Sequence, residues 1–282
     1  MRWKSIKQYW PLFKSLQTLL LTVTGVAGFM SARCPIQHWS SMVALVFSLL
    51  FAIAGSTVLN MWYDRDIDSV MNRTHHRPLA QGKISPRNAL GLGLVLSILG
   101  IGIGFILAPL YSLILLLGIV FDFLVYTVWL KRRTCWSIVW GGIAGGMPIL
   151  AGRVLGIGQV DLIGILLMLS VLFWIPTHIL TFSIHYAEDY AAAGIPTFPF
   201  TYGIKFTRNL VVVSTIIAAV LITSAAILIQ VSGGFLHLLG ILSGALVMMA
   251  LFVMFRPSRL ANFSLFKYAS VYMLAAMLLL AF

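Results

Sequence analysis

The stretch Asn60-Met-Trp-Tyr-Asp64-Arg-Asp66-Ile-Asp68 lies between two apolar segments, each long enough to cross a bilayer. Three of the seven acidic residues of the chain fall within positions 64–68. Carboxylates at the edge of a bilayer are costly unless cations lie beside them. The apolar segments therefore predict a membrane protein, and the carboxylates between them predict a site at the membrane surface.

The composition of the whole chain points the same way. Its 282 residues are 60% hydrophobic and 9% charged, with a mean hydropathy of +1.00. No soluble fold buries so much apolar sequence, so we expect an all-α polytopic membrane protein. The net charge of +12 does not indicate nucleic acid, because it is distributed by membrane side. Cys34 and Cys135 match no metal-binding spacing and are interpreted as structural thiols.

Hydropathy predicts nine transmembrane helices, and the polar residues between them are expected to form a cap on the cytoplasmic side. The third and fourth helices are separated at Ala108-Pro109, which we expect to form a tight turn. The nine expected spans cover residues 15–32, 40–60, 88–107, 110–130, 136–155, 161–182, 209–230, 234–255 and 264–282. Glycine-rich runs such as 141–146 are typical of close helix packing.

Positive charge is concentrated on one side of these spans. If the N-terminus is cytoplasmic, 17 of the 19 basic residues lie on the cytoplasmic side, and only Arg33 and Arg153 lie outside. This asymmetry supports the span count and the orientation. Residues 1–14 are basic and aromatic and show no signal-peptide cleavage site. We therefore expect a multi-pass protein of the plasma membrane, with its site on the cytoplasmic side.

A second acidic stretch, His185-Tyr-Ala-Glu188-Asp189-Tyr, follows four spans after the first. Both stretches end a predicted span on the cytoplasmic side. We expect one domain over residues 1–282, with an internal repeat of four-helix units at about 15–130 and 136–255 and a ninth helix after them.

The first acidic stretch has the spacing of a metal site. Asn60, Asp64 and Asp68 are spaced i, i+4, i+8 and share one helix face, whereas Asp66 is turned away. Oxygen donors stacked on one face repel one another unless a cation intervenes, and Mg²⁺ prefers such ligands together with phosphate oxygens. The alternative is a solvated helix end that nearby arginines balance.

The second acidic stretch is a weaker signal by itself, because a loop Glu-Asp pair is usually solvated. In a repeated architecture, Glu188 and Asp189 would face the first stretch and bind a second Mg²⁺ across a diphosphate.

Basic residues on the same side would complete a site for a departing diphosphate. Positive-inside topology alone also explains them, although Arg77 is favoured because Pro78 fixes the backbone beside it. The candidates are Lys14, Arg73, Arg77, Lys131 and Arg132.

Span six contains Trp174-Ile-Pro176-Thr-His178. Pro176 frees a backbone carbonyl and is expected to bend the helix. His178 and His185 lie near one helix face. The histidine in the span either forms a hydrogen bond inside the bundle or contacts a large planar or metal-bearing acceptor. Asp122, four residues before Tyr126, has no role that the sequence assigns.

These residues resemble the UbiA superfamily of intramembrane prenyltransferases, whose first acidic motif, Asn-x-x-x-Asp-x-x-x-Asp, is matched by Asn60, Asp64 and Asp68. Within the superfamily the chain is most similar to the branch that farnesylates heme. The further matches, over most of residues 14–200, are Asn72-Arg73-Thr-x-x-Arg77-Pro78-Leu79, Tyr126-Thr-x-Trp-Leu130-Lys131-Arg132-Arg133-Thr134, Trp174-x-Pro176-x-His178 and Glu188-Asp189-Tyr190. Glu188 stands where Asp is common, and His185 stands where many members carry an acid.

The resemblance implies transfer of a farnesyl group from farnesyl diphosphate to a vinyl group of heme B, with addition of water, giving heme O and diphosphate. It implies that the nine helices surround a central cavity open to the lipid. It also implies catalytic roles for Asp64, Asp68, Arg77 and Lys131, and Mg²⁺ as the cofactor. The acceptor-binding residues that it implies are Tyr126, His178 and His185.

Two alternatives stay open at this stage. The first is a prenyltransferase for another acceptor, either a quinone precursor or a prenylglyceryl phosphate lipid. The second is a cation-coupled secondary transporter, although transporter sites lie near the bilayer midplane and these acids lie at its edge. The sequence leaves open whether heme A synthase or a terminal oxidase receives the product.

Overall fold

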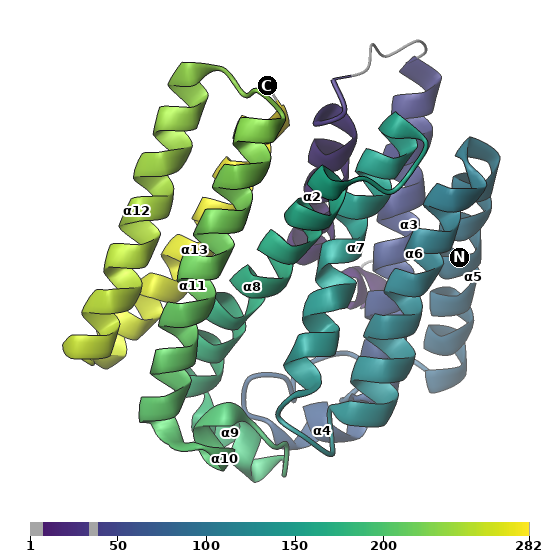
Figure 1. Ribbon diagram of the computed structural model, residues 1–282. Helices are drawn as coiled ribbons and strands as arrows, with labels where there is room; N and C mark the ends of the chain where they lie inside the picture. Colours follow the sequence, from purple (N-terminus) through teal and green to yellow (C-terminus); the bar gives the residue numbers. More distant parts are fainter. Residues whose placement is uncertain (1–7, 34–38, 282) are drawn as a thin grey trace.

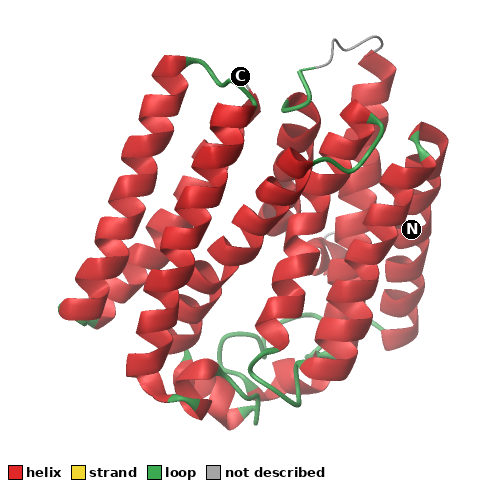
Figure 2. Cartoon of the chain, in the orientation of Figure 1, coloured by secondary structure: helices red, strands yellow, loops and turns green. Residues whose placement is uncertain are grey.

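The computed structural model describes residues 8–33 and 39–281, and every regular element in these ranges is helical (Figure 2). Nine helical segments in the described ranges are long and apolar enough to cross a membrane, which confirms the predicted number. The principal helices are α2 (Ser15–Met30), α3 (Trp39–Tyr63), α5 (Pro86–Leu107), α6 (Pro109–Ile119), α7 (Ser137–Ile157), α8 (Leu162–His185), α11 (Gly203–Leu228), α12 (Gly233–Phe255) and α13 (Arg259–Ala281).

The helices form two groups that meet at α7 and α8 (Figure 1). One buried apolar cluster joins α3, α6 and α7 around residues such as Leu49 and Tyr111. A second, larger cluster joins α8 to α11, α12 and α13 around residues such as Leu239 and Tyr272. The larger cluster also includes Ala27 of α2 and Ile149 of α7, so it packs the two groups against each other.

Several predicted boundaries were wrong in the same direction. The seventh span starts at Gly203 rather than at 209, and the ninth starts at Arg259 rather than at 264. The second continues to Tyr63 rather than ending at 60. Long basic side chains keep their charges in the interface while their stems cover apolar surface, so a helix continues through residues that lower the hydropathy. The expected turn between spans three and four is confirmed at Ala108, whose backbone is extended.

The fourth span contains a feature that hydropathy does not predict. After α6 the backbone changes to a π-helix, η2 (Val120–Leu130), which continues the span to its end. π-Helical segments are rare and are frequent at functional sites.

Short helices close one end of the bundle. α4 (Arg65–Val70), α9 (Ala187–Ala192) and α10 (Phe198–Thr201) lie together at the bottom of Figure 1. An apolar contact that includes Ile67, Met71 and Ile195 packs the segment around α4 against the segment that follows α9. The two acidic stretches, more than a hundred residues apart, are thus held at the same end of the molecule.

At the opposite end, the buried guanidinium of Arg153 donates to Asp161, with Nη2 2.7 Å from Oδ2. A second nitrogen of Arg153 donates to the backbone carbonyl of Ser31 at 2.8 Å. Burial would raise the pKa of Asp161, but the Arg153 guanidinium and the Gly164 amide outweigh burial and lower this pKa. This ion pair neutralises the buried charge of Arg153 at the end of the bundle away from the acidic stretches.

Candidate active site

The first acidic stretch passes from α3 into α4 without losing its helical register. The amide of Asp64 donates to the Asn60 carbonyl at 2.9 Å, and that of Asp68 donates to the Asp64 carbonyl at 2.8 Å. Asp64 and Asp68 are both buried. Asp66 is turned away, as predicted, and its side chain is 61% exposed.

Each of these carboxylates has a basic partner. Lys131 forms an ion pair with Oδ2 of Asp64. Nη1 of Arg77 lies 2.8 and 2.7 Å from the two oxygens of Asp68. Arg132 pairs with Asp66 instead, through two hydrogen bonds of 2.7 Å. Three of the five basic residues expected at a diphosphate site are therefore held against the first acidic stretch.

The charges in this cluster affect one another. Burial opposes protonation of Lys131, but Tyr126 and Asp64 nearby outweigh it and raise the pKa of this amine. The two hydrogen bonds from Arg132 lower the pKa of Asp66. Lys131 therefore stays a cation and Asp66 an anion over the physiological pH range.

The second acidic stretch joins the first through the backbone. The amide of Arg73 donates to Oδ2 of Asp189 at 3.1 Å. The Arg73 guanidinium lies over the rings of Phe182 and Tyr186, 4.9 and 5.7 Å from their centroids. Asp189 is buried, whereas Glu188 is exposed. The structure thus places Asp189 close to the first stretch and leaves Glu188 at the surface.

A cavity of about 560 Å³ lies in the bundle next to this charged cluster, and Asn60, one helical turn before Asp64, is the residue of the acidic motif that lines it. Its polar end includes Lys14, Asn60 and Asp122, and its walls include apolar residues of α2, α3, α6, α7, α8 and α13. Leu16 and Leu274 line the cavity and are 71% and 36% exposed, so the cavity reaches the outer surface beside α2 and α13. A polar end and an apolar, lipid-open body suit a substrate with a charged head and a hydrocarbon tail.

The two candidate histidines lie in different environments. His178 lines the cavity, and its ring stacks between Trp174 and Phe266 at centroid distances of 5.0 and 4.5 Å. Its Nδ1 lies 3.2 Å from the Ser270 hydroxyl. His185 is exposed, stacks on Phe263 at 4.7 Å, and is not among the residues that line the cavity.

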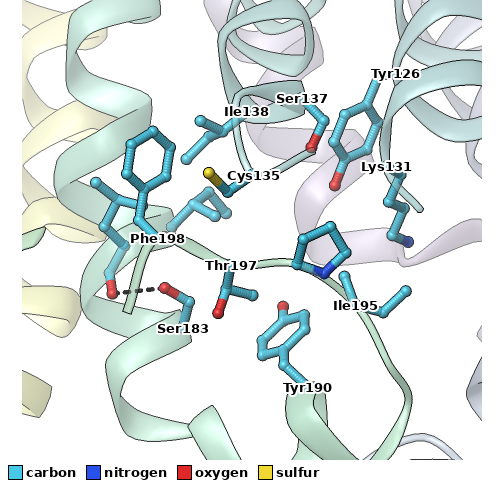
Figure 3. A pocket seen from close by; sticks show the side chains of 13 residues that line it. Tyr126, Lys131, Cys135, Ser137, Ile138, Ser183, Tyr190, Ile195, Thr197 and Phe198 are labelled. Atoms are coloured by element: carbon cyan, nitrogen blue, oxygen red, sulfur yellow. Dashed lines mark hydrogen bonds between the residues drawn. The ribbon is translucent and has the colours of Figure 1, made fainter. Parts of the chain in front are cut away.

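A second, smaller pocket of about 60 Å³ lies beside the ion pair of Lys131 (Figure 3). Lys131, Tyr190 and Tyr126 line it, and Tyr126 also lines the large cavity. Tyr190 was not a candidate site residue in the sequence, although it belongs to the Glu188-Asp189-Tyr190 match, because the acidic residues were the ones assigned a role there.

Whether Mg²⁺ fits the polar end depends on the oxygen donors that are present there. In the part of the chain that the structure describes, no group of three or more Asp, Glu, His or Cys residues surrounds a metal position. However, the buried Oδ1 of Asp64 accepts no hydrogen bond from any described residue. Mg²⁺ usually takes only one or two protein carboxylates and completes its shell with phosphate oxygens and water. The site therefore fits Mg²⁺ carried in with a diphosphate.

The fold and the site define a helical membrane protein with a lipid-open cavity and a cap of carboxylates and cations. The chain matches the UbiA prenyltransferase family over residues 20–279, and it belongs to that family.

Several relatives carry the name protoheme IX farnesyltransferase. The protein of Korarchaeum cryptofilum is 40% identical over 210 residues, covering 74% of this chain and 71% of its own. The protein of Pyrobaculum arsenaticum is 40% identical over 245 residues, which cover 85% of this chain and 83% of the relative. The protein of Desulforudis audaxviator is 32% identical over 274 residues, which cover 95% of this chain and 85% of the relative.

Solved structures share the fold at lower sequence identity. A structure of digeranylgeranylglyceryl phosphate synthase superposes with a TM-score of 0.81 and 20% identity, covering 99% of this chain and 98% of the other. A UbiA homologue from Archaeoglobus fulgidus bound to GPP and Mg²⁺ superposes with a TM-score of 0.68 and 18% identity, covering 98% and 100%. These likenesses confirm the predicted fold, and the family and the relatives' names favour neither the transporter nor a prenyltransferase for another acceptor.

Proposed function

We propose that this prenyltransferase moves a farnesyl group from farnesyl diphosphate to a vinyl group of heme B, in a reaction that depends on Mg²⁺. The vinyl group attacks the allylic carbon as diphosphate leaves, and water then adds to the cation formed on the heme side chain and loses a proton, which gives heme O. The observation that carries the proposal is an apolar cavity whose polar end, at Lys14, Asn60 and Asp122, adjoins the ion pairs of Asp64 and Asp68. The choice of heme as the acceptor is supported by the name that the relatives carry.

The cap would hold the diphosphate. Lys131 and Arg77 already lie against Asp64 and Asp68, so an incoming diphosphate would exchange carboxylate partners for phosphate oxygens. Lys14, at the polar end of the cavity, and Arg73 and Arg132 would add positive charge. As the C–O bond of the donor breaks, its electron pair goes to the diphosphate, and these cations stabilise the charge that develops.

Mg²⁺ would be held by Asn60, Asp64, Asp68 and Asp189, directly or through water, with Glu188 at the margin of the site. When bound, it neutralises diphosphate charge and favours departure of the leaving group. Asp64 and Asp68 would therefore act on the reacting phosphate oxygens, while the apolar walls keep water from the allylic carbon until the acceptor attacks.

The acceptor would lie against His178 and Tyr126. Nδ1 of His178 is occupied by the Ser270 hydroxyl, and no described residue forms a hydrogen bond with its Nε2. Both faces of the ring are covered by Trp174 and Phe266. An acceptor would therefore meet the edge of this ring, and an iron-bearing acceptor would meet Nε2. His185 stays a prediction for acceptor binding, at an exposed position.

The cell context of this reaction is also proposed. The distribution of basic residues supports a plasma-membrane protein with a cytoplasmic N-terminus and a cytoplasmic cap. Heme A synthase, or the assembly of a terminal oxidase, would then receive the product.

The test is mass spectrometry of heme extracted after purified protein is incubated with heme B, farnesyl diphosphate and Mg²⁺. We expect a heme heavier by one farnesyl group plus water, and none of it in the presence of EDTA. Unmodified heme with diphosphate released would reject heme as the acceptor. Modified heme in the presence of EDTA would reject the metal dependence.

A further inference from the structure

The π-helix η2 places two polar residues, Asp122 and Thr127, on the same face of its helix. They are five residues apart, the interval that a π-helix closes with its i→i+5 hydrogen bonds. In an α-helix of 3.6 residues per turn, five positions would turn one side chain well away from the other. The change from α6 to η2 is therefore what brings both side chains to one neighbour, Asn60.

The side-chain amide of Asn60 is held at both ends. Its Nδ2 donates to Oδ2 of Asp122 at 2.7 Å. Its Oδ1 accepts from the hydroxyl of Thr127, which is fully buried, at 2.9 Å. The same oxygen of Asp122 also accepts from the Ser56 hydroxyl at 2.6 Å. Asn60, Asp122 and Ser56 all line the large cavity.

Asp122 decides which end of the amide faces which way. Oδ2 of Asp122 accepts from the Ser56 hydroxyl and from Asn60 at the same time, so the Asn60 group that faces this oxygen is the NH₂. The Thr127 hydroxyl donates or accepts and would tolerate either orientation. With the NH₂ held by Asp122, the carbonyl oxygen of Asn60 is presented on the other side, where one lone pair accepts from Thr127 and the second stays available.

We propose that Asp122 and Thr127 are positioning residues, which clamp the Asn60 amide so that its oxygen faces a divalent cation bound with the prenyl diphosphate. This rests on the proposed role of Asn60 as a metal ligand. It gives Asp122 a role that the acidic motifs do not assign, and it explains why the fourth span changes its helical register beside the site. Partners that orient a metal ligand typically affect metal affinity by about 10- to 100-fold.

The clamp is tested by Mn²⁺ binding, measured by electron paramagnetic resonance of free Mn²⁺ in the presence of farnesyl S-thiolodiphosphate, a slowly reacting donor analogue. Asp122→Asn keeps the shape of the side chain but allows the Asn60 amide to exchange its oxygen and nitrogen positions. We expect this variant to weaken Mn²⁺ binding by about 10-fold or more. Thr127→Val should do the same, whereas Thr127→Ser should restore affinity to within about twofold of wild type because it keeps the hydroxyl.

Ser56→Ala is the matched control, because it removes a hydrogen bond from the same Asp122 oxygen without touching Asn60. It should leave Mn²⁺ affinity within about twofold of wild type. If Asp122→Asn misfolds, the proposal is tested by comparing the Mn²⁺ affinities of Thr127→Val and Thr127→Ser. Wild-type affinity in folded Asp122→Asn or Thr127→Val would overturn the clamp. So would wild-type affinity in Asn60→Ala, or a wild-type protein that binds no Mn²⁺.

Binding of Mn²⁺ with the donor analogue does not involve the acceptor, so failure of the clamp and failure of heme as the acceptor are separate results. A protein that shows the expected Mn²⁺ series but leaves heme unmodified would keep the clamp and reject the acceptor. A protein that farnesylates heme, but whose variants all bind Mn²⁺ with wild-type affinity, would keep heme as the acceptor and reject the clamp.

Discussion

Asp64 is the residue of the acidic motif that lies near two of the basic residues, Lys131 and Arg132. One oxygen of this buried carboxylate pairs with Lys131, while the other accepts no hydrogen bond from any described residue and lies 4.0 Å from Arg132. A buried carboxylate oxygen without a partner is costly. That cost would be relieved by a cation, so the residue is better suited to binding a ligand than to holding the fold together.

We expect Asp64→Asn to lower the rate of diphosphate release by ~100-fold or more, because it removes a charge that acts on the leaving group. Asp66→Asn is the matched control, since Asp66 is exposed and paired at the surface. It should keep near-normal turnover. Turnover by Asp64→Asn that equals that of the control would rule out Asp64 as an essential ligand.

The two histidines give a second test at the residue scale. We expect His178→Ala to shift the absorption spectrum of bound heme, because His178 lines the cavity with its ring held by Trp174 and Phe266. His185→Ala, at an exposed position outside the cavity lining, should leave the spectrum unchanged. An unchanged spectrum in His178→Ala would show that His178 packs against its neighbours and does not contact the heme.

At the scale of the elements, glycines bring α2 against α7. A Cβ atom added at Gly152 would lie 1.8 Å from the backbone oxygen of Gly25, and one added at Gly28 would lie 2.1 Å from that of Ile149. Small residues allow this approach, which is how membrane helices pack without a hydrophobic driving force. The glycine-rich run of α7 also packs on α8, because a Cβ at Gly146 would lie 2.7 Å from the Met168 carbonyl oxygen.

We expect Gly152→Ala to destabilise the protein by roughly 1–3 kcal/mol, since the backbones of α2 and α7 must separate. Gly102→Ala in α5 is the matched control, because an added Cβ there has nothing within 4 Å. The helix propensity of alanine makes it neutral or stabilising. The measurement is the thermal unfolding midpoint in detergent, and equal midpoints for the two variants would refute the close packing.

At the scale of the whole molecule, the bundle has a cap at one end and the Arg153–Asp161 pair at the other. The acidic motifs, the short helices and the paired cations gather at the capped end, and the cavity runs from it toward the lipid. One face of the membrane would thus supply the charged donor while the bilayer receives the apolar parts of both substrates.

The orientation of the molecule is tested by cysteine labelling in a Cys34→Ser, Cys135→Ser background. Gln81 lies in the loop at the capped end and Gln159 in a loop at the opposite end, and both are exposed. A membrane-impermeant maleimide should label Gln159→Cys in intact spheroplasts, and Gln81→Cys only in inverted vesicles. The reverse pattern would place the cap outside.

The sequence by itself determined the number of spans and the residues of the acidic motif. Apolar segments of bilayer length must become helices in lipid, because backbone groups find no other partners there. The spacing of Asn60, Asp64 and Asp68 likewise follows from local helix geometry. The internal repeat, which depends on how the two halves compare, stays a prediction.

Only the tertiary structure decided which residues act together. Arg132 was expected among the diphosphate-binding cations but pairs with the exposed Asp66 in the structure, while Lys131 beside it pairs with Asp64. Asp122 had no role in the sequence, because its link to Asn60 depends on a π-helix and on contact between two spans. Sequence spacing fixes neighbours along one helix, whereas packing between helices fixes neighbours that are more than sixty residues apart.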